Sequence, residues 1–285
     1  MQPVRAWQPV KLDRRRSPRR PPFWSLLLGG IILAYLFGPF RTNVLLLGTD
    51  DLPERGLLGR TDTIILATVV PLKPYVGMLS IPRDLWVNVP DVGEQRINTA
   101  YFFAESNQAG SGPGAAIQTV RENFGVSVNY YAVIHMLGLV STVDALGGVD
   151  IQLNSPMAGF PAGVHHLDGA QALVFVRERQ SSSDFERMQR GQILLLATFR
   201  KLLSPVSWLN LPRFIFALAE TIDTNIPIWQ WPRLLFALIR TILFGIDNRT
   251  ITREMVMPFQ TSGGAQVLAP NWDAINPMLD EMFGK

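Results

Sequence analysis

The segment from Asn43 to Asp50 reads NVLLLGTD, and after one polar loop the segment from Thr63 to Val70 reads TIILATVV. Each is a short, continuous apolar run next to Gly, Thr or Asp, which is typical of a strand buried on both faces. Val76 to Ile81 predicts a third strand after a turn that contains prolines. Strands buried on both faces need covering layers, so we expect helices on both sides of a sheet.

Helical and extended patterns alternate through the rest of the chain. Extended segments are expected at residues 85–89, 130–135, 149–153 and 252–257. Helices are expected at 112–124, 137–146, 168–175, 184–203, 206–222, 230–244 and 271–283. With no repeat and no convincing linker, residues 41–285 are predicted to form one layered α/β/α domain with a central mixed sheet.

The N-terminal region differs from the rest in charge and hydropathy. Residues 1–22 contain seven Lys or Arg and one Asp, a net charge of +6, and 21–40 contain no charged residue. Twenty such residues in a helix just reach across a hydrocarbon core of about 30 Å. Because positive flanks stay in the cytoplasm, we predict a cytoplasmic tail at 1–22, a single transmembrane signal-anchor helix at 23–40 and an extracytoplasmic domain. A cleaved signal peptide is the alternative, disfavoured by the long apolar run and the lack of a small-residue cleavage site before Arg41.

Composition excludes several classes of function. The chain has no cysteine, so disulfides, thiolate catalysis and cysteine-ligated metals are excluded. The net charge of +3 becomes −3 once the +6 tail is removed, so the domain lacks the overall positive charge expected of a nucleic-acid-binding protein. The three histidines do not form a metal-binding pattern. Any metal is therefore expected on oxygen ligands.

Two aspartates stand at the ends of the first two strands. Asp50 closes the first strand and Asp62 precedes the apolar part of the second. Ligands of open α/β sheets gather beyond strand ends, and carboxylates are ligands that Mg²⁺ or Mn²⁺ prefers. The alternative is structural, with one aspartate capping a turn and the other paired with Arg60.

Arginines recur near these carboxylates. Arg177 and Arg179 lie at a predicted helix end, while Arg187 and Arg190 are three apart and share a face of the 184–203 helix. Guanidinium groups bind phosphate in a bidentate way, so several of them in one cleft would suit a diphosphate. A solvated charged helix face that includes Asp184 is the alternative.

The motifs LLLGTD, GRTDTI, SIPRD, QRINTAY, VDALGGVDI, HLDGAQALVFVRER and DFERMQRGQ occur in this order between residues 44 and 192. In this combination the chain resembles the LytR-CpsA-Psr family of bacterial cell-envelope enzymes. The resemblance implies a phosphotransferase of the cell membrane that moves a glycan from a polyprenyl-pyrophosphate carrier onto a peptidoglycan hydroxyl through a phosphodiester. It also implies a Mg²⁺ or Mn²⁺ cofactor, a membrane-borne donor and no nucleic acid as partner.

Site residues follow from the same resemblance. Asp50 and Asp62 match the metal-binding aspartates, and Asp62, Arg60 and Arg83 match the catalytic group. The positions that match pyrophosphate-binding residues are Arg60, Arg83, Arg96, Arg177, Arg179, Arg187, Arg190 and Gln192. Two positions depart from the family pattern: Gly191 stands where Gln is common, and His135 where an acidic residue is frequent.

Two other functions remain open from the sequence. Hydrolysis of the same donor would use the same residues, with water as acceptor, and a non-catalytic protein could hold a phosphorylated lipid without turnover. The apolar helices at 206–222 and 230–244 either line a groove for the lipid or pack in the ordinary way. Arg233 and Arg240, on one side of the second helix, are expected to meet lipid headgroups or water.

Overall fold

The computed structural model describes residues 23–38, 40–49, 59–72, 75–178 and 184–285. The chain divides into two units, Met1–Gly38 and Pro39–Lys285. The first contains helix α1 (Phe23–Leu36), and the predicted basic tail, residues 1–22, lies outside the described residues. Within the described ranges, no helix is both long and apolar enough to cross a membrane. All other helices and strands belong to the second unit.

A six-stranded sheet forms the centre of the second unit, in the order β10-β3-β2-β1-β6-β9. Its strands are β1 (Thr42–Thr49), β2 (Thr61–Val70), β3 (Tyr75–Ser80), β6 (Tyr130–His135), β9 (Ile222–Thr224) and β10 (Asp247–Thr250). From the pairing, β1, β3, β6 and β10 run in one direction, and β2 and β9 run in the other. The predicted mixed sheet is thus confirmed.

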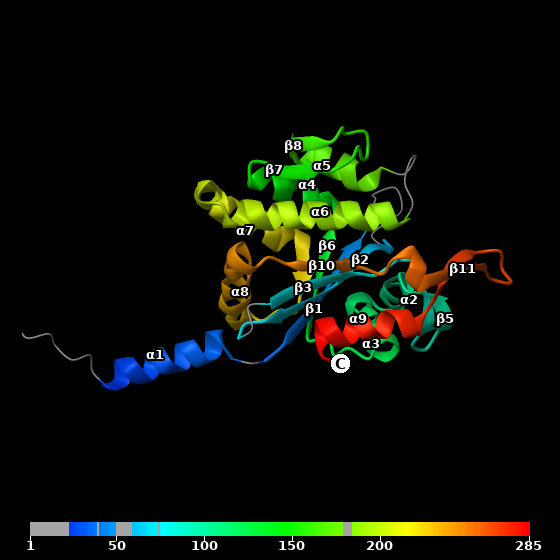
Figure 1. Ribbon diagram of the computed structural model, residues 1–285, viewed down its shortest axis with the longest axis horizontal. Coiled ribbons are helices and arrows are strands. Elements are labelled where there is room, and N and C mark those ends of the chain that lie inside the picture. The colour runs from blue at the N-terminus through cyan, green and yellow to red at the C-terminus, as the bar shows by residue number, and fades with distance from the viewer. Residues whose placement is uncertain (1–22, 39, 50–58, 73–74, 179–183) are drawn as a thin grey trace, which may run out of the picture. The chain divides into compact units, whose positions relative to one another are not determined.

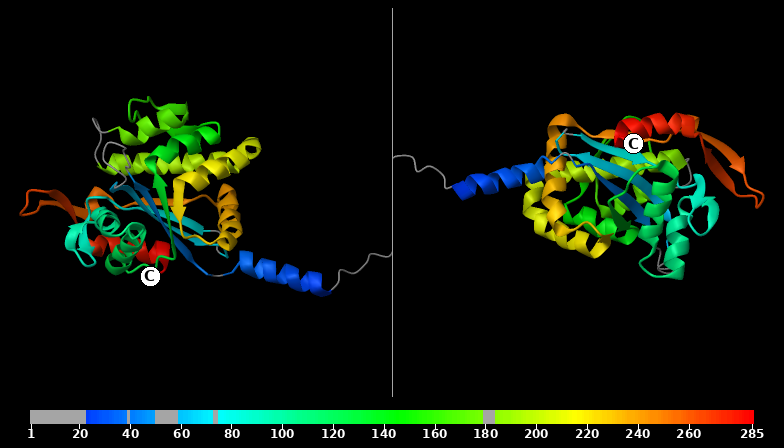
Figure 2. Two further views of the ribbon diagram at one scale, coloured as in Figure 1. Left: turned by 180° about the vertical axis from the view of Figure 1, so that it is seen from behind. Right: turned by 90° about the horizontal axis from the view of Figure 1, so that it is seen from below.

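Helices cover both faces of this sheet (Figures 1 and 2). One face carries α2 (Thr99–Asn107), α3 (Gly112–Phe124) and α9 (Trp272–Phe283). The other carries α4 (Met136–Ala145), α5 (Gly169–Arg177) and α6 (Asp184–Leu203), together with the hairpin of β7 (Val149–Leu153) and β8 (Gly163–Leu167). The remaining helices are α7 (Leu211–Thr221), α8 (Trp231–Phe244) and the 3-10 turns 205–210, 228–230 and 253–255. Two further hairpins pair β4 (Trp86–Val89) with β5 (Gly93–Arg96) and β11 (Val256–Gln260) with β12 (Gln266–Pro270).

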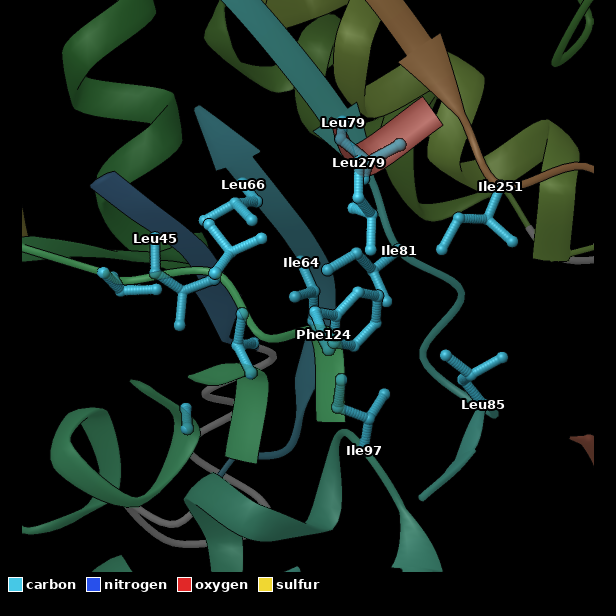
Figure 3. Close-up of a cluster of buried hydrophobic side chains, with 14 of the residues drawn as sticks. Leu45, Ile64, Leu66, Leu79, Ile81, Leu85, Ile97, Phe124, Ile251 and Leu279 are labelled. Atoms are coloured by element: carbon cyan, nitrogen blue, oxygen red, sulfur yellow. The ribbon is translucent and has the colours of Figure 1, made fainter. Parts of the chain in front are cut away.

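The main core lies between the sheet and the layer of α3 and α9. Alternate residues of each strand face it, because strand side chains change faces at every residue. Its strand members include Leu45, Leu47, Ile64, Leu66, Leu79 and Ile81. Phe124, Ile275 and Leu279 close it from the helices, and Figure 3 shows Phe124 among the strand side chains. A second core joins α4, α5, α6, β7 and β8, so the opposite layer has a core of its own.

A chain of polar side chains ties the edge strand β10 to β3 and α9. Tyr75 donates to Asp247 at 2.8 Å, and Arg249 donates to Asp247 and to both carboxylate oxygens of Glu281. Burial alone would raise the pKa of Asp247, but the hydrogen bonds from Arg249 and Tyr75 outweigh it and hold that pKa below its usual value. Asp247 is therefore an ionised anchor of the sheet edge.

Most predicted elements occur where the pattern placed them, and the segment 252–257 is the main error. It was predicted as a strand, but the structure ends β10 at Thr250, forms a 3-10 turn and begins β11 at Val256. The sequence Asp-Asn-Arg-Thr of β10 has no apolar alternation because this strand lies at the edge of the sheet, so its backbone pairing with β3 leaves no hydrophobic signal. Helix α2 and the short strands β5, β8, β9 and β12 were also missed.

Candidate functional site

Polar side chains gather at one end of the sheet, beyond the C-terminal residues of its four parallel strands. Thr49 ends β1, Ser80 ends β3, His135 ends β6 and Thr250 ends β10. Because β2 runs in the opposite direction, its first residues lie at this same end of the sheet. The sheet topology thus collects residues from distant parts of the sequence in one place.

Asp62 lies at an irregularity in β2, at this end of the sheet. Gly48 pairs with Thr63, but the next residue, Thr49, pairs with Thr61, so the register shifts here and Asp62 is the extra residue of a β-bulge. Such a bulge bends the strand and redirects a side chain, and bulges are frequent beside active sites. The Asp62 side chain is 22% exposed, so its carboxylate is held near the surface rather than in the core.

Arg83 joins Asp62 directly. It follows β3 in a turn, and its Nη1 donates to Asp62 Oδ1 at 2.7 Å. Asp84, the next residue, lies 3.6 Å from Arg83 Nε and 3.1 Å from Arg96 Nε. The predicted residues Asp62, Arg83 and Arg96 are therefore brought together, and Asp84 links the two arginines. Asp84 had no predicted role, although its place beside Arg83 in the motif SIPRD was the available signal.

The QRINTAY motif supports this cluster through its backbone. The Asn98 amide donates to the Arg83 carbonyl at 3.3 Å, and the Asn98 carbonyl accepts from the Thr61 hydroxyl at 3.3 Å. Arg96 also donates to the Gln266 carbonyl at 2.8 Å, on strand β12. The start of β2, which carries Asp62, and the turn that carries Arg83 are thus both bonded to Asn98 near the point where the two side chains meet.

The motifs VDALGGVDI and HLDGAQALVFVRER mainly build the support for Arg177. Asp168 caps α5 with a reciprocal capping box, and Asp144 accepts from the Gly169 amide at 2.7 Å. At Gly169 any β-carbon would lie 2.3 Å from the Val140 carbonyl oxygen, so α5 can approach α4 only with glycine there. Arg177, partly buried, is the last residue of the helix that these contacts fix.

Arg190 lies elsewhere than expected. Its side chain is 0% exposed, and its guanidinium donates to the carbonyls of Phe175 and Glu178 at 3.2 and 2.8 Å and to the Glu178 carboxylate at 3.3 Å. A group enclosed in this way has no surface to offer a pyrophosphate. The helical spacing between Arg187 and Arg190 was predicted correctly. The Arg190 side chain, however, points into the interior, where it fastens α6 to the end of α5.

Gln192 is also enclosed, by a hydrogen-bond network rather than by charge. Its amide nitrogen donates to Ser80 Oγ at 2.6 Å and to the Arg249 carbonyl at 2.9 Å. Its amide oxygen accepts from Asn248 and Thr250, at 3.1 and 3.3 Å. Gln192 therefore connects α6 to the ends of β3 and β10, which accounts for its burial.

A pocket of about 530 Å³ opens beside this network. It is lined by Phe185, Gln189, Gln192, Ile193, Asn248, Thr250, Thr252 and Arg253. Arg253 stacks over the Phe185 ring at 5.4 Å, so the pocket combines amide and hydroxyl groups with one aromatic and cationic wall. Gly191, the departure noted in the sequence, lies on the β2 side instead, where an added β-carbon would lie 3.6 Å from Thr63.

The other predicted residues have different surroundings. Arg60 is exposed and stacks over Phe102 of α2 at 5.6 Å, and Arg187 is partly buried on α6. His135 ends β6 beside β1, with its Nδ1 3.2 Å from Thr49 Oγ1. Asp50 and Arg179 lie outside the described residues. Asp62 is therefore the predicted metal ligand whose surroundings can be described.

The predicted metal site depends on the oxygen ligands that the side chains at this end of the sheet can offer. Among the described residues, no group of three or more His, Asp or Glu side chains is arranged to hold a metal ion. Mg²⁺ is commonly bound by one or two carboxylates together with water and substrate phosphates, so a closed protein cage is not needed. The Asp62 carboxylate, partly exposed at the bulge, fits this kind of site.

Comparison with known proteins extends these observations. Residues 40–279 match the LytR_cpsA_psr family. The chain is 33% identical over 248 residues to a protein of Oceanobacillus iheyensis named polyisoprenyl-teichoic acid–peptidoglycan teichoic acid transferase TagU, covering 85% of this chain and 75% of that protein.

The fold is also similar to solved structures. Protein gbs0355 of Streptococcus agalactiae has a TM-score of 0.71 at 24% identity, covering 88% of this chain and 91% of that one. TagT bound to LI-WTA has a TM-score of 0.67 at 23% identity, covering 87% and 92%. At these identities the likeness concerns the fold alone.

Proposed function

Because the chain belongs to the LytR_cpsA_psr family, we propose that it is a phosphotransferase that moves a glycan from a polyprenyl-pyrophosphate carrier onto a peptidoglycan hydroxyl. The 33% identity to a protein named as a teichoic acid transferase supports a teichoic-acid-like polymer as the donor glycan. The observation that carries the proposal is the contact of Asp62 with Arg83 at the strand ends, where a carboxylate and a guanidinium share one partly exposed site.

Charge neutralisation is the main demand of this reaction. A pyrophosphate concentrates negative charge, and phosphoryl transfer is accelerated chiefly by positioning and by electrostatic stabilisation. Arg83 and Arg96, held in place by Asp84, would bind the phosphate oxygens, with Arg177, Arg187, Arg60 and, outside the described residues, Arg179 contributing further positive charge. Arg190 and Gln192 would act as positioning residues, since both are buried and bonded to protein groups.

The transfer breaks one bond of the pyrophosphate and forms one new bond. The acceptor hydroxyl oxygen attacks the phosphorus on the glycan side and loses its proton as the bond forms. The bridging oxygen leaves with the carrier as polyprenyl phosphate, whose growing charge the arginines stabilise. The polar pocket beside Gln192, which includes the last residue of β10, would offer about 530 Å³ for sugar residues.

A divalent cation, Mg²⁺ or Mn²⁺, would be held by Asp62 together with Asp50. When bound, it would neutralise charge on the pyrophosphate oxygens. The Asp62–Arg83 hydrogen bond would orient the carboxylate for that role.

The proposed setting is the outer face of a bacterial membrane. The uncharged stretch 21–40 behind a tail of net charge +6 supports an N-terminal anchor with the tail in the cytoplasm. The donor lipid and the domain would then share one membrane, and the peptidoglycan acceptor would lie on the same side.

The test is a transfer assay with the full-length protein, lipid-linked teichoic acid precursor, peptidoglycan fragments and Mg²⁺. Wild type should yield a phosphodiester-linked product detectable by mass spectrometry, and chelation should abolish it. Asp62→Asn, which keeps the side-chain volume, should lose turnover. A wild-type rate in Asp62→Asn would rule out the metal assignment.

Omission of the peptidoglycan fragments separates transfer from hydrolysis. A transferase should consume little donor without acceptor, whereas a hydrolase should release glycan phosphate at an unchanged rate. Donor binding without either product would instead support the non-catalytic alternative.

A further inference from the structure

Helix α8 has its arginines on the inner side. Arg233 is buried and donates to the backbone carbonyl of Phe40, and Arg240 donates to that of Pro71. Ala237, between them, is buried in a small core cluster. The expectation that Arg233 meets lipid headgroups or water is therefore wrong, because its guanidinium is buried and fastens α8 to the segment before β1. The Arg240 guanidinium, which is partly buried, fastens α8 to the end of β2.

The outer side of α8 is apolar. Trp231, Leu235, Ile239 and Leu243 recur at four-residue spacing, and all four are exposed, Leu243 to 80%. A surface helix ordinarily shows the reverse, with its apolar stripe against the core. Contiguous exposed apolar surface of this kind marks an interaction site.

Two neighbouring segments extend this surface. Phe40, whose carbonyl binds Arg233, is 71% exposed, and Leu72, next to the carbonyl that binds Arg240, is 55% exposed. We call Phe40, Leu72, Trp231, Leu235, Ile239 and Leu243 the α8 patch. Three separate stretches of sequence thus place apolar side chains around one helix, which is not expected of isolated exposed residues.

We propose that the α8 patch docks on the surface of the lipid bilayer. Two features favour lipid over protein. The segment 224–246 contains no Asp or Glu, so nothing in it repels anionic headgroups, and a tryptophan in the patch suits the membrane interface. Phe40 is also the last residue of the predicted transmembrane segment 23–40. A bilayer that holds that segment must come close to the patch.

The docking would set the height of the candidate site. The small cluster under α8 includes Val69, near the end of β2, whereas Asp62 lies near its start. Seven residues of strand span roughly 23 Å. The pyrophosphate would therefore react roughly 23 Å along β2 from the docked end of that strand. This consequence rests on the proposed function, whereas the docking itself rests only on the apolar surface and the anchor.

Site-specific fluorescence can test this because the chain contains no cysteine. The full-length protein, at one copy per lipid nanodisc, would carry an environment-sensitive dye on Ile239→Cys or Leu243→Cys. Met257→Cys is the matched control, since Met257 is an exposed apolar residue of β11, at the far end of the sheet from α8 (Figure 1). Leu33→Cys reports separately on insertion of the apolar segment.

Nitroxide-labelled lipids should quench most of the fluorescence of a dye at position 239 or 243 and little of it at position 257. Aqueous iodide should quench the dye at position 257 strongly and the dyes at positions 239 and 243 weakly. Equal access of iodide to 239, 243 and 257, with the dye at 33 quenched by lipid, would overturn the docking and leave the anchor intact. Protection from iodide without quenching by lipid would also overturn it, because protein would then cover the patch. Quenching by lipid at 239 and 243 but not at 33 would support the docking and contradict the anchor.

Discussion

Replacement of Arg190 by Met should destabilise the protein strongly while leaving the substrate surface chemically unchanged. The substitution keeps most of the side-chain length but removes the hydrogen bonds to the Phe175 and Glu178 carbonyls and the ion pair with Glu178. Loss of one partner of a buried pair costs about 3–5 kcal/mol. Because Glu178 keeps 19% exposure, water can partly solvate its carboxylate, so we expect about 3 kcal/mol.

Thermal unfolding followed by circular dichroism measures this loss. For a domain of this size, each kcal/mol lowers Tm by about 2–4 °C, so Arg190→Met should melt roughly 6–12 °C below wild type. Arg187→Met is the matched control on the same helix. Because Arg187 is only partly buried, its replacement should cost less than about 1 kcal/mol while transfer activity falls.

Activity distinguishes positioning from contact. If Arg190 acts by holding the end of α5, then Arg177→Met should cost much less activity in the Arg190→Met background than in wild type. A Tm within about 2 °C of wild type in Arg190→Met, combined with complete loss of donor binding, would refute the reasoning and make Arg190 a substrate contact.

Three further outcomes follow from the structure. Gly191→Ala should raise the free energy of unfolding by about 0.5–1 kcal/mol in urea titrations, because the helix loses a flexible residue and the new β-carbon meets Thr63 at ordinary contact distance. Gln192→Leu should lower it by about 1–3 kcal/mol in the same titrations, since Ser80 and a buried carbonyl lose their donor. Asp247 has a lowered pKa when folded, so its ionic contribution to stability is present above the unfolded value of about 3.9 and is lost as pH falls through the folded value. The stability difference between wild type and Asp247→Asn should therefore be constant near neutral pH and shrink below about pH 4, as measured by unfolding at a series of pH values.

The sequence predicted elements best where a strong pattern had clear punctuation. Helix α3 ends at Gly125, which has a left-handed φ of 65°, and helix α5 begins at the capping residue Asp168, so local chemistry marked both boundaries. Strand β10 had no such pattern. Its place at the edge of the sheet depends on backbone pairing with β3, more than 160 residues earlier in the sequence. It also depends on the hydrogen bonds that connect the side chains of Tyr75, Asp247, Arg249 and Glu281.

The residues of the candidate site also divide into those that the sequence predicted and those that only the folded structure could place. Residue types and motif order were enough to select Asp62, Arg83 and Arg96, which the structure brings within contact of one another or of Asp84. The same reasoning also selected Arg190, which is buried. A motif records which residues are present, but exposure depends on which neighbours surround them after folding.

By itself, the sequence determined the layered α/β architecture, because that follows from local periodicity, and its ordered motifs carried the resemblance that identified the family. Only the tertiary structure decided that Arg190 is buried and fastens α6 to α5, and that α8 turns Arg233 inward and Leu235 and Leu243 outward. The physical reason is that helical spacing specifies which residues share a face, whereas the packing of distant segments decides what that face meets.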